Sequence, residues 1–318
     1  MRKKGKIRKN RNSVAVITGN ETDVEMNLLG EDIFRYFGLG CRSVSKLFVP
    51  KSYNFDAFFN GMFSKKEIIN NTKYANNYDY NKAVYLMSEF DILENGFLMI
   101  KEDESYSSPI ASVFYEYYDN LDQLQQKLQE KLQQNLQELV AEILQEAKAQ
   151  GADQAEVSAS VDAGLSVSVR KGELENLEFN EDRGFGITLY LGKRKGSAST
   201  TDAGPSAIRD TVNAARRIAT FTQEDDCNGL ADAELMPQQL IDLDLYHPWE
   251  VSPEQAAELA QACEQAGLST DARLTNSDGA QVSTQRSTRI YGNSHGFIGA
   301  YSGTRQGISC VLIGEDEQ

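Results

Sequence analysis

The four cysteines and two histidines of this sequence are the side chains best able to act as nucleophiles or metal ligands. The first cysteine, Cys41, follows a stretch broken by Gly38 and Gly40. Two glycines let the backbone turn tightly and leave the sulfur accessible, and a helix beginning near Cys41 would lower the pKa of its thiol. These residues leave two alternatives open for Cys41, a buried structural thiol, which is the commoner case for a lone cysteine in an apolar context, and an accessible nucleophile.

The remaining cysteines and histidines do not have the spacing of a metal site. His247 precedes a proline, which disfavours a helix, and His295 lies in an Asn-Ser-His-Gly turn where a local hydrogen bond is expected. Neither lies in an H-E-x-x-H or H-E-x-x-x-H pattern, and a zinc site needs three or four ligands. Cys227, Cys263 and Cys310 are expected to be small structural apolar residues. We expect no metal ion and no cofactor in this chain.

A strand, a helix and a second strand are predicted around Cys41. Residues 14–17 form a short apolar run, residues 23–37 carry apolar residues at helical spacing, and a β-rich run ends at Pro50. Within that run Ser43-Val-Ser-Lys46 matches the S-x-x-K signature of serine acylases. That signature needs a helix, so the strand-like run favours a chance match.

Residues 121–150 predict one long amphipathic helix. Leucine, valine and isoleucine recur at steps of three and four residues, Asn120 can cap the start, and Gly151 can end the helix. The low-complexity Leu/Gln repeat leaves two alternatives open, a helix packed within a domain and a coiled coil that self-associates.

Residues 151–318 predict an α+β domain built from antiparallel hairpins. Short strands are expected at 155–161, 165–170, 173–179, 184–191 and 195–200, and again at 273–283, 286–291, 296–304 and 308–313. Between these two sets, Ser206 is expected to cap a helix over 207–220. Ser252 opens a second helix, which runs to Gly267.

The composition changes abruptly near residue 120. Residues 1–120 carry no net charge and no glutamine, whereas residues 121–318 carry the whole net charge of −15 and all 20 glutamines. The acidic second part argues against binding to nucleic acid or anionic membranes. No apolar run is long enough to span a bilayer, and cysteines without paired spacing suggest a reducing cytoplasm. We interpret the change as the junction of two sequences of different origin, and two ordinary domains with different packing needs are the alternative.

The segment around Cys41, from Gly30 to Pro50, resembles the catalytic-cysteine segment of LuxC-like fatty acyl-CoA reductases in the aldehyde dehydrogenase superfamily. The resemblance covers residues 13–130 and implies a truncated α/β catalytic segment. It also implies that Cys41 attacks an acyl thioester, which NADPH then reduces to an aldehyde. The sequence contains no strand–G-x-G-x-x-G–helix unit, so we expect no reduction of acyl-CoA by this chain.

Residues 131–318 are similar to the N-terminal domain of PmbA (TldE) in the TldD/PmbA family of metallopeptidase complexes. The similarity rests on several segments, which include Glu175-Asn-Leu-Glu-Phe-Asn180, Arg194-Lys-Gly-Ser-Ala-Ser199 and Tyr291-Gly-Asn-Ser-His-Gly296. It implies a non-catalytic subunit domain that pairs with a zinc-bearing TldD subunit around a proteolytic chamber. It also implies that the C-terminal domain of the family is absent.

Together these features predict a chimera, in which a reductase-like segment (1–120) and a PmbA-like domain (151–318) are joined by the helix at 121–150. A natural gene fusion and the joining of two sequence fragments both remain open as its origin. We expect a cytoplasmic protein that is inactive alone, partners a TldD-like subunit and loses residues 1–120 first on limited proteolysis. The alternative is an NADPH-dependent acyl-CoA reductase whose nucleotide-binding half comes from another chain.

Overall fold

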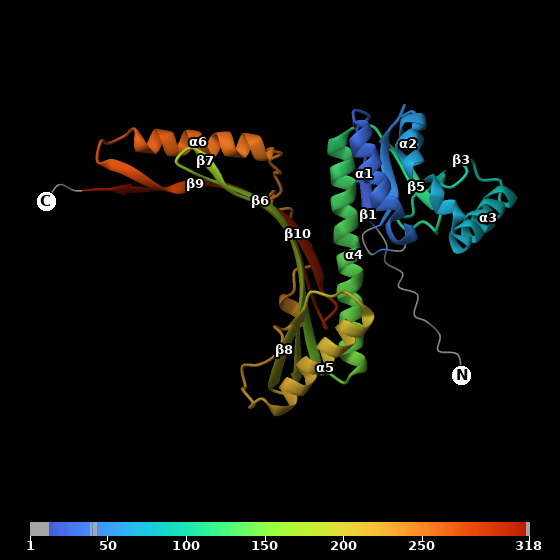
Figure 1. The fold of residues 1–318 in the computed structure, drawn as a ribbon. Coiled ribbons are helices and arrows are strands. Elements are labelled where there is room, and N and C mark those ends of the chain that lie inside the picture. Colours follow the sequence, from blue (N-terminus) through green and yellow to red (C-terminus); the bar gives the residue numbers. More distant parts are fainter. Residues whose placement is uncertain (1–12, 39, 41–42, 316–318) are drawn as a thin grey trace. The chain divides into compact units, whose positions relative to one another are not determined.

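The computed structural model describes residues 13–38, 40 and 43–315, and it divides the chain into two compact units (Figure 1). The first unit is Met1–Leu128 and the second is Gln129–Gln318. The division falls inside the long helix α4 (Leu121–Ala149). Cys41, the predicted nucleophile, lies outside the described residues.

The first unit is an α/β unit with a mostly parallel sheet. Its strand order is β1-β2-β5-β4-β3, and only β3 runs antiparallel to its neighbour. The strands are β1 (Ser13–Val16), β2 (Val44–Pro50), β3 (Ile92–Glu94), β4 (Met99–Glu102) and β5 (Ser112–Tyr118). The helices are α1 (Asp23–Phe34), α2 (Phe55–Met62) and α3 (Thr72–Met87), with 3-10 turns η1 (Arg35–Gly38) and η2 (Phe63–Asn70).

Helix α1 ends earlier than the sequence predicted. A capping box between Thr22 and Glu25 fixes its start, since each residue's side chain accepts from the other's backbone N–H. The helix stops at Phe34 because Tyr36 and Phe37 take left-handed backbone angles, with φ of 54° and 60°. Phe37, predicted to continue the apolar face, is accordingly exposed.

The first unit has its own hydrophobic core. The central strands β2 and β4 bury their side chains almost completely, as expected for a parallel sheet. Phe58 and Met62 of α2 are fully buried in the same cluster. The apolar strands therefore have partners within this unit.

Helix α4 matches the helix predicted at 121–150. The Asn120 side chain accepts a hydrogen bond from the Gln123 N–H at 2.8 Å, and Gly151 follows with a positive φ of 84°. Val140 and Ile143 from its apolar stripe are buried in a core of the second unit. This burial supports packing within a domain over self-association for this half of the stripe.

The second unit is a five-stranded, fully antiparallel sheet in the order β10-β9-β6-β7-β8. Its strands are β6 (Gln154–Arg170), β7 (Glu173–Leu191), β8 (Arg194–Thr200), β9 (Leu274–Asn293) and β10 (Ile298–Gly314). For each of β6, β7, β9 and β10 the sequence predicted two short strands, and this prediction is wrong because each is one long strand. These long strands bend midway without losing their pairing (Figure 1).

Three helices cover one face of this sheet. Helix α4 and helix α5 (Pro205–Phe221) bury Val157, Phe185 and Ile187, while helix α6 (Pro253–Leu268) buries Val167 and Val282. The predicted cap of α6 is confirmed, since Ser252 and Gln255 form a capping box. The predicted cap of α5 is wrong. Its N-cap is Gly204, and Pro205 takes the first turn, where a missing N–H costs nothing.

Candidate functional site

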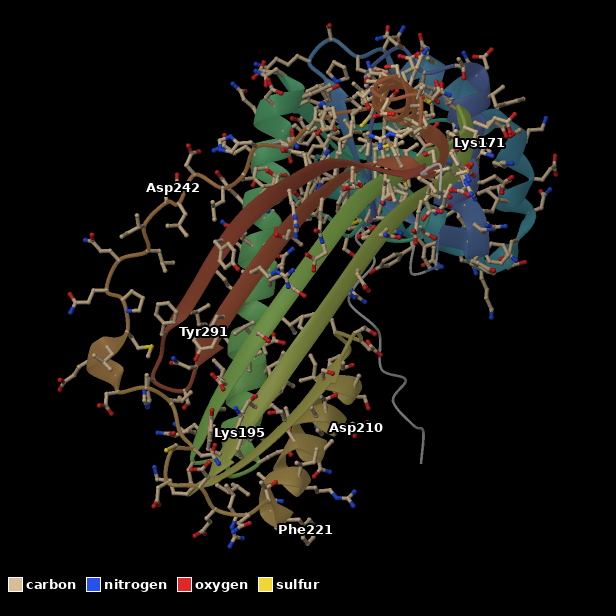
Figure 2. The ribbon with its side chains drawn as sticks, turned by 90° about the vertical axis from the view of Figure 1, so that its left-hand side faces the viewer. Lys171, Lys195, Asp210, Phe221, Asp242 and Tyr291 are labelled. Carbon is tan, nitrogen blue, oxygen red and sulfur yellow. The ribbon has the colours of Figure 1, made fainter. Side chains whose placement is uncertain are left out.

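The face of the second sheet opposite its helices carries a hollow lined mostly by apolar side chains. Because side chains alternate along a strand, this face presents Ser158 and Ser160 of β6, Tyr291 of β9 and Tyr301 of β10. Tyr291 is labelled on this face in Figure 2. We call it the open face. A cavity of about 550 Å³ lies on it.

Small residues form the floor of this cavity. Ser158 and Ser160 lie beside Gly184 and Gly186 of β7, and a Cβ at Gly186 would come within 2.7 Å of the Ser158 hydroxyl. The walls are aromatic and aliphatic, with the Phe297 ring 6.2 Å from that of Tyr291. The cavity can therefore accept an apolar side chain that larger floor residues would exclude.

Glu156 links two tyrosines at one end of the open face. Tyr190 donates to Glu156 Oε1 at 2.9 Å, and Tyr291 donates to Oε2 at 3.0 Å. Burial, together with the hydrogen bond to Glu156, raises the pKa of Tyr190 to about 12. Both phenols are therefore neutral donors at physiological pH, and they hold Glu156 as an acceptor.

A loop segment, residues 240–247, lies along the open face and the outer edge of β10; we call it the strap. Leu240 and Leu245 approach Gly299 and Gly303 of β10, where a larger residue would fill the space they occupy. Leu240, Ile241 and Leu243 line the cavity. The strap thus forms one wall of the hollow.

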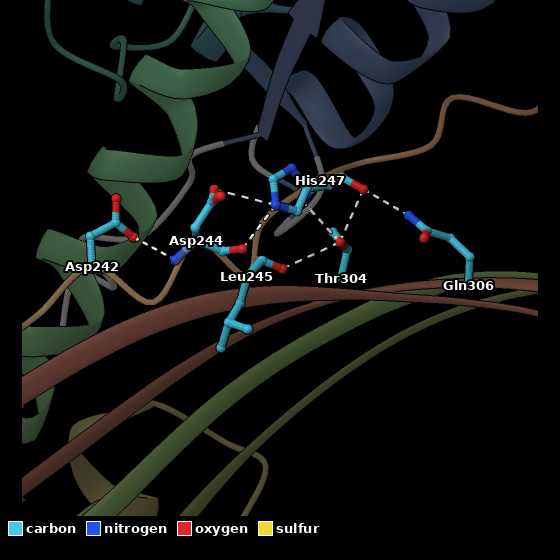
Figure 3. A network of polar contacts seen from close by, with 6 residues as sticks. All are labelled: Asp242, Asp244, Leu245, His247, Thr304 and Gln306. Atoms are coloured by element: carbon cyan, nitrogen blue, oxygen red, sulfur yellow. Dashed lines mark hydrogen bonds and ion pairs between the residues drawn. The ribbon is translucent and has the colours of Figure 1, made fainter.

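Backbone and side-chain hydrogen bonds fix the strap to β10 (Figure 3). The Thr304 N–H donates to the Leu245 carbonyl at 2.9 Å, and the His247 N–H donates to Thr304 Oγ1 at 3.0 Å. Gln306 Nε2 donates to the His247 carbonyl at 2.7 Å. The strap therefore covers part of the β10 edge.

Next to the cavity, at the bend of the sheet, the open face continues as a polar groove of about 1060 Å³. Its lining includes carboxylates from β6 and β7 and the side chains of Arg289 and Arg305. Arg289 pairs with Asp162 at 2.8 Å. Apolar and charged binding surfaces thus lie side by side on one sheet.

Both histidines, for which the sequence predicted no metal-binding role, make local contacts. The His247 ring nitrogen Nε2 lies 2.8 Å from the Asp244 carbonyl oxygen and 3.3 Å from the Asp244 carboxylate (Figure 3). At His295 the backbone N–H donates to the Asn293 side chain at 3.1 Å, which is the local turn bond that the sequence predicted. Across residues 13–38, 40 and 43–315, no three His, Cys, Asp or Glu residues gather as a metal site would require.

The three described cysteines differ in environment. Cys263 of α6 and Cys310 of β10 pack against the same buried cluster, as expected of small apolar residues. Burial raises the pKa of the Cys310 thiol, and the neighbouring Cys263 raises it further. Cys227 is exposed, so its predicted structural role is wrong.

The S-x-x-K residues of the first unit do not form a catalytic pair. Ser43 donates to the Arg35 carbonyl, whereas Lys46 Nζ lies 3.1 Å from Glu116 Oε2 and also donates to the Asp103 carbonyl. Burial lowers the pKa of the fully buried Lys46, and Glu116 opposes this shift. Sequence reasoning missed this buried ion pair because a lysine within an apolar strand carries no signal of its partner.

No helix in the part of the chain that the structure describes is long and apolar enough to cross a membrane.

Comparison with known proteins shows that two segments of the second unit are similar to metallopeptidase domains. Residues 155–219 match the PmbA/TldA metallopeptidase domain 1, and residues 246–318 match the PmbA/TldA metallopeptidase central domain. The metalloprotease PmbA of Escherichia coli O157:H7 is 50% identical over 153 residues, covering 48% of this chain and 34% of that protein. The PmbA homologue of Haemophilus influenzae is 47% identical over 151 residues, with the same coverage of 48% and 34%.

A solved structure supports the fold of the second unit. A candidate modulator of DNA gyrase from Bacteroides thetaiotaomicron gives a TM-score of 0.53 at 21% identity, over 57% of this chain and 41% of that protein. The sequence matches confirm the predicted PmbA resemblance, and the chain spans about a third (34%) of the length of these curated relatives. Both family matches lie beyond residue 130, so the acyl-CoA-reductase resemblance stays a prediction.

Proposed function

We propose that the second unit is a PmbA/TldE-like, non-catalytic subunit domain that pairs with a TldD-type metallopeptidase subunit in peptide processing. The observation that carries this proposal is the 50% identity over 153 residues to a PmbA metalloprotease. The matches to two successive PmbA/TldA domains, in the same order along the chain, add to it.

The geometry of the second unit supports a role in binding rather than bond cleavage. Both histidines make local contacts that hold the strap and a turn. The described residues offer no ligand set that fits zinc, so the proposal assigns the metal to the partner subunit. The open face, with its apolar cavity and polar groove, is the surface that we expect to face a peptide in such a complex.

A reconstituted peptidase assay tests this proposal. The full chain is mixed with a TldD-type subunit, and cleavage of an unstructured peptide is followed by mass spectrometry. We expect cleavage by the mixture, sensitive to a zinc chelator, and none by this chain alone. Chelator-sensitive cleavage by this chain alone would contradict the non-catalytic role, and an inactive mixture would contradict the pairing.

For residues 13–130 we propose, as the alternative function, thioester formation at Cys41 by the resemblance to acyl-CoA reductases. The parallel sheet of the first unit supports it, because an α/β segment is what the resemblance implies. The test is covalent labelling with a long-chain acyl-thioester probe, with Cys41→Ser as the control. Equal labelling of the two proteins would remove this proposal, and sustained aldehyde formation with NADPH would contradict the expected absence of reduction.

A further inference from the structure

One edge of the second sheet is unpaired over most of a strand. Strand β8 pairs with β7 only over residues 185–191, so residues 173–184 of β7 have β6 on one side. Among the described residues, no strand pairs with the other side of this segment, which we call the open edge. Residues 173–183 are exposed throughout.

The opposite edge of the same sheet, along β10, is partly covered by the strap. There the strap pairs with β10 through the Thr304–Leu245 hydrogen bond and the contacts of His247. Exposed strand edges present backbone donors and acceptors to any extended chain, and folded proteins usually cover them. The open edge is thus a ready surface for adding a strand.

The hairpin geometry shows which backbone groups of the open edge are free. Leu191 and Arg194 flank a two-residue turn, and such turns are closed by a hydrogen-bonded pair. Hydrogen-bonding direction alternates along a strand, so from Leu177 to Leu191, where the register with β6 is regular, the odd-numbered residues of β7 point their N–H and C=O groups away from β6. At Leu177, Phe179 and Glu181 these groups therefore point outward from the sheet.

The side chains of the open edge differ in chemical character between the two faces of the sheet. Leu174, Leu177 and Phe179 share the helix-covered face with Leu165 and Val167, yet they are 56%, 51% and 75% exposed. On the open face, Glu178 and Asp182 line the polar groove. The helix-covered face of the edge is thus apolar at Leu174, Leu177 and Phe179, and the open face is acidic at Glu178 and Asp182.

The charge of the open edge disfavours a second copy of this chain as its occupant. The segment carries Glu173, Glu175, Glu178, Glu181 and Asp182, with Arg183 as its one basic residue. Two such edges placed together would set carboxylates opposite carboxylates, which is destabilising. A basic strand would instead meet complementary charge.

We propose that the open edge of β7 binds a free extended peptide in which basic and apolar residues alternate, as an added strand of the sheet. Its backbone pairs with Leu177, Phe179 and Glu181. Its apolar side chains lie beside Leu177 and Phe179, and its Lys or Arg side chains lie beside the carboxylates of the polar groove. This inference rests on the second sheet alone and does not depend on a TldD-type partner.

The test is fluorescence anisotropy with the full chain and a labelled eight-residue peptide of alternating Lys and Val. Phe179→Pro removes an outward N–H without removing a bond to β6, and we expect it to weaken binding about tenfold or more. Phe179→Ala keeps the N–H and is the matched control, with a loss of about threefold from reduced apolar contact. Circular dichroism checks that both variants fold.

A second arm needs no variant of the protein. The same peptide, N-methylated at alternate residues along the edge facing β7, is expected to lose binding, since it keeps charge and composition but lacks the donors. Equal binding of the methylated peptide, or of Phe179→Pro, would overturn the added-strand geometry. A dimer that forms without peptide and is lost in Phe179→Pro would overturn the peptide as occupant.

Discussion

At the scale of single residues, Glu264 is the clearest structural carboxylate of the second unit. It is 2% exposed, and its two oxygens accept from the N–H groups of Lys171 and Gly172 at 2.9 and 2.8 Å. These two residues form the β6–β7 turn with positive φ values of 53° and 76°. Glu264 therefore fixes helix α6 to that turn.

Replacing Glu264 by Gln is expected to destabilise the second unit by about 1–3 kcal/mol, because an amide has one acceptor oxygen for two N–H groups. Urea unfolding followed by circular dichroism measures the change. Glu258→Gln, an exposed substitution on the same helix, is the matched control and is expected to leave the midpoint unchanged. Equal effects of the two variants would contradict the assigned role of Glu264.

The contribution of Glu264 also predicts a pH dependence. Burial raises the pKa of Glu264, but hydrogen bonds from Ser277, Lys171 and Gly172 outweigh it and hold the pKa below the ordinary 4.5. A depressed carboxyl pKa stabilises the fold above 4.5, and this contribution is lost as pH falls through the folded-state value. The stability difference between wild type and Glu264→Gln is therefore expected to be constant near neutral pH and to shrink in acid. A difference that grows in acid would contradict this sign.

Thiol labelling reports the environment of the described cysteines. Cys227 is exposed, whereas Cys310 has a raised pKa from burial and from the adjacent Cys263. Because the thiolate is the reactive form, iodoacetamide at neutral pH is expected to label Cys227 several-fold faster than Cys310. Peptide mass spectrometry over a time course measures the rates, and faster labelling of Cys310 would contradict the packing of α6 on β10.

At the scale of elements, the sequence predicted where the strands of the second unit lie but not their length. Asp162-Ala-Gly164 and the polar run near Asp182 interrupt the alternating pattern, and we interpreted them as strand ends. In the structure they lie at the bend, where β6, β7 and β9 stay paired. The alternation of apolar and polar residues indicates which side chains of a strand are buried. At this bend the side chains are not buried in a core, although the backbone hydrogen bonding between the strands continues.

The close packing of helix α5 on the sheet depends on one glycine of β8. A Cβ on Gly196 would lie 2.1 Å from the Ala215 carbonyl oxygen and 2.3 Å from the Ala219 nitrogen, so α5 packs directly on the strand backbone. Gly196→Ala is expected to destabilise the second unit by about 1–3 kcal/mol through overpacking. Differential scanning calorimetry measures the change.

Gly184 of β7 is the matched control for this substitution. A Cβ there would meet only the Ser160 hydroxyl, at 3.7 Å, which is ordinary contact. Gly184→Ala is therefore expected to leave stability unchanged or to raise it by up to about 1 kcal/mol. A larger loss in Gly184→Ala than in Gly196→Ala would contradict the packing of α5.

At the scale of the whole molecule, the sequence predicted helix α4, the cap of α6, the α+β class of the second part and its PmbA resemblance. These features rest on local spacing or on similarity along the chain. It did not predict the strap, the buried Lys46–Glu116 pair or the open edge of β7. Each of these depends on residues that are far apart in sequence, such as Leu245 and Thr304.

The structure predicts a different first site of limited proteolysis from the one that the sequence predicted. We expected residues 1–120 to be removed first, but the described part of the first unit has a closed core of its own. A long, mostly exposed stretch of the second unit, residues 222–252, has only the 3-10 turn η3 (Ala233–Leu235) as regular structure and contains Glu224 and Glu234. A glutamate-specific protease is expected to cut there first, as read by intact mass. Early loss of residues 1–120 would instead support the expectation from sequence.

The proposed pairing of the second unit with a TldD-type subunit is tested most directly by light scattering after size-exclusion chromatography. The full chain and the partner are each run alone and then mixed. Phe179→Pro, which alters the open edge only, is run as a control and is expected to pair like the wild type. We predict one heteromeric peak with the summed mass of both chains; two separate peaks at unchanged masses would contradict the claim.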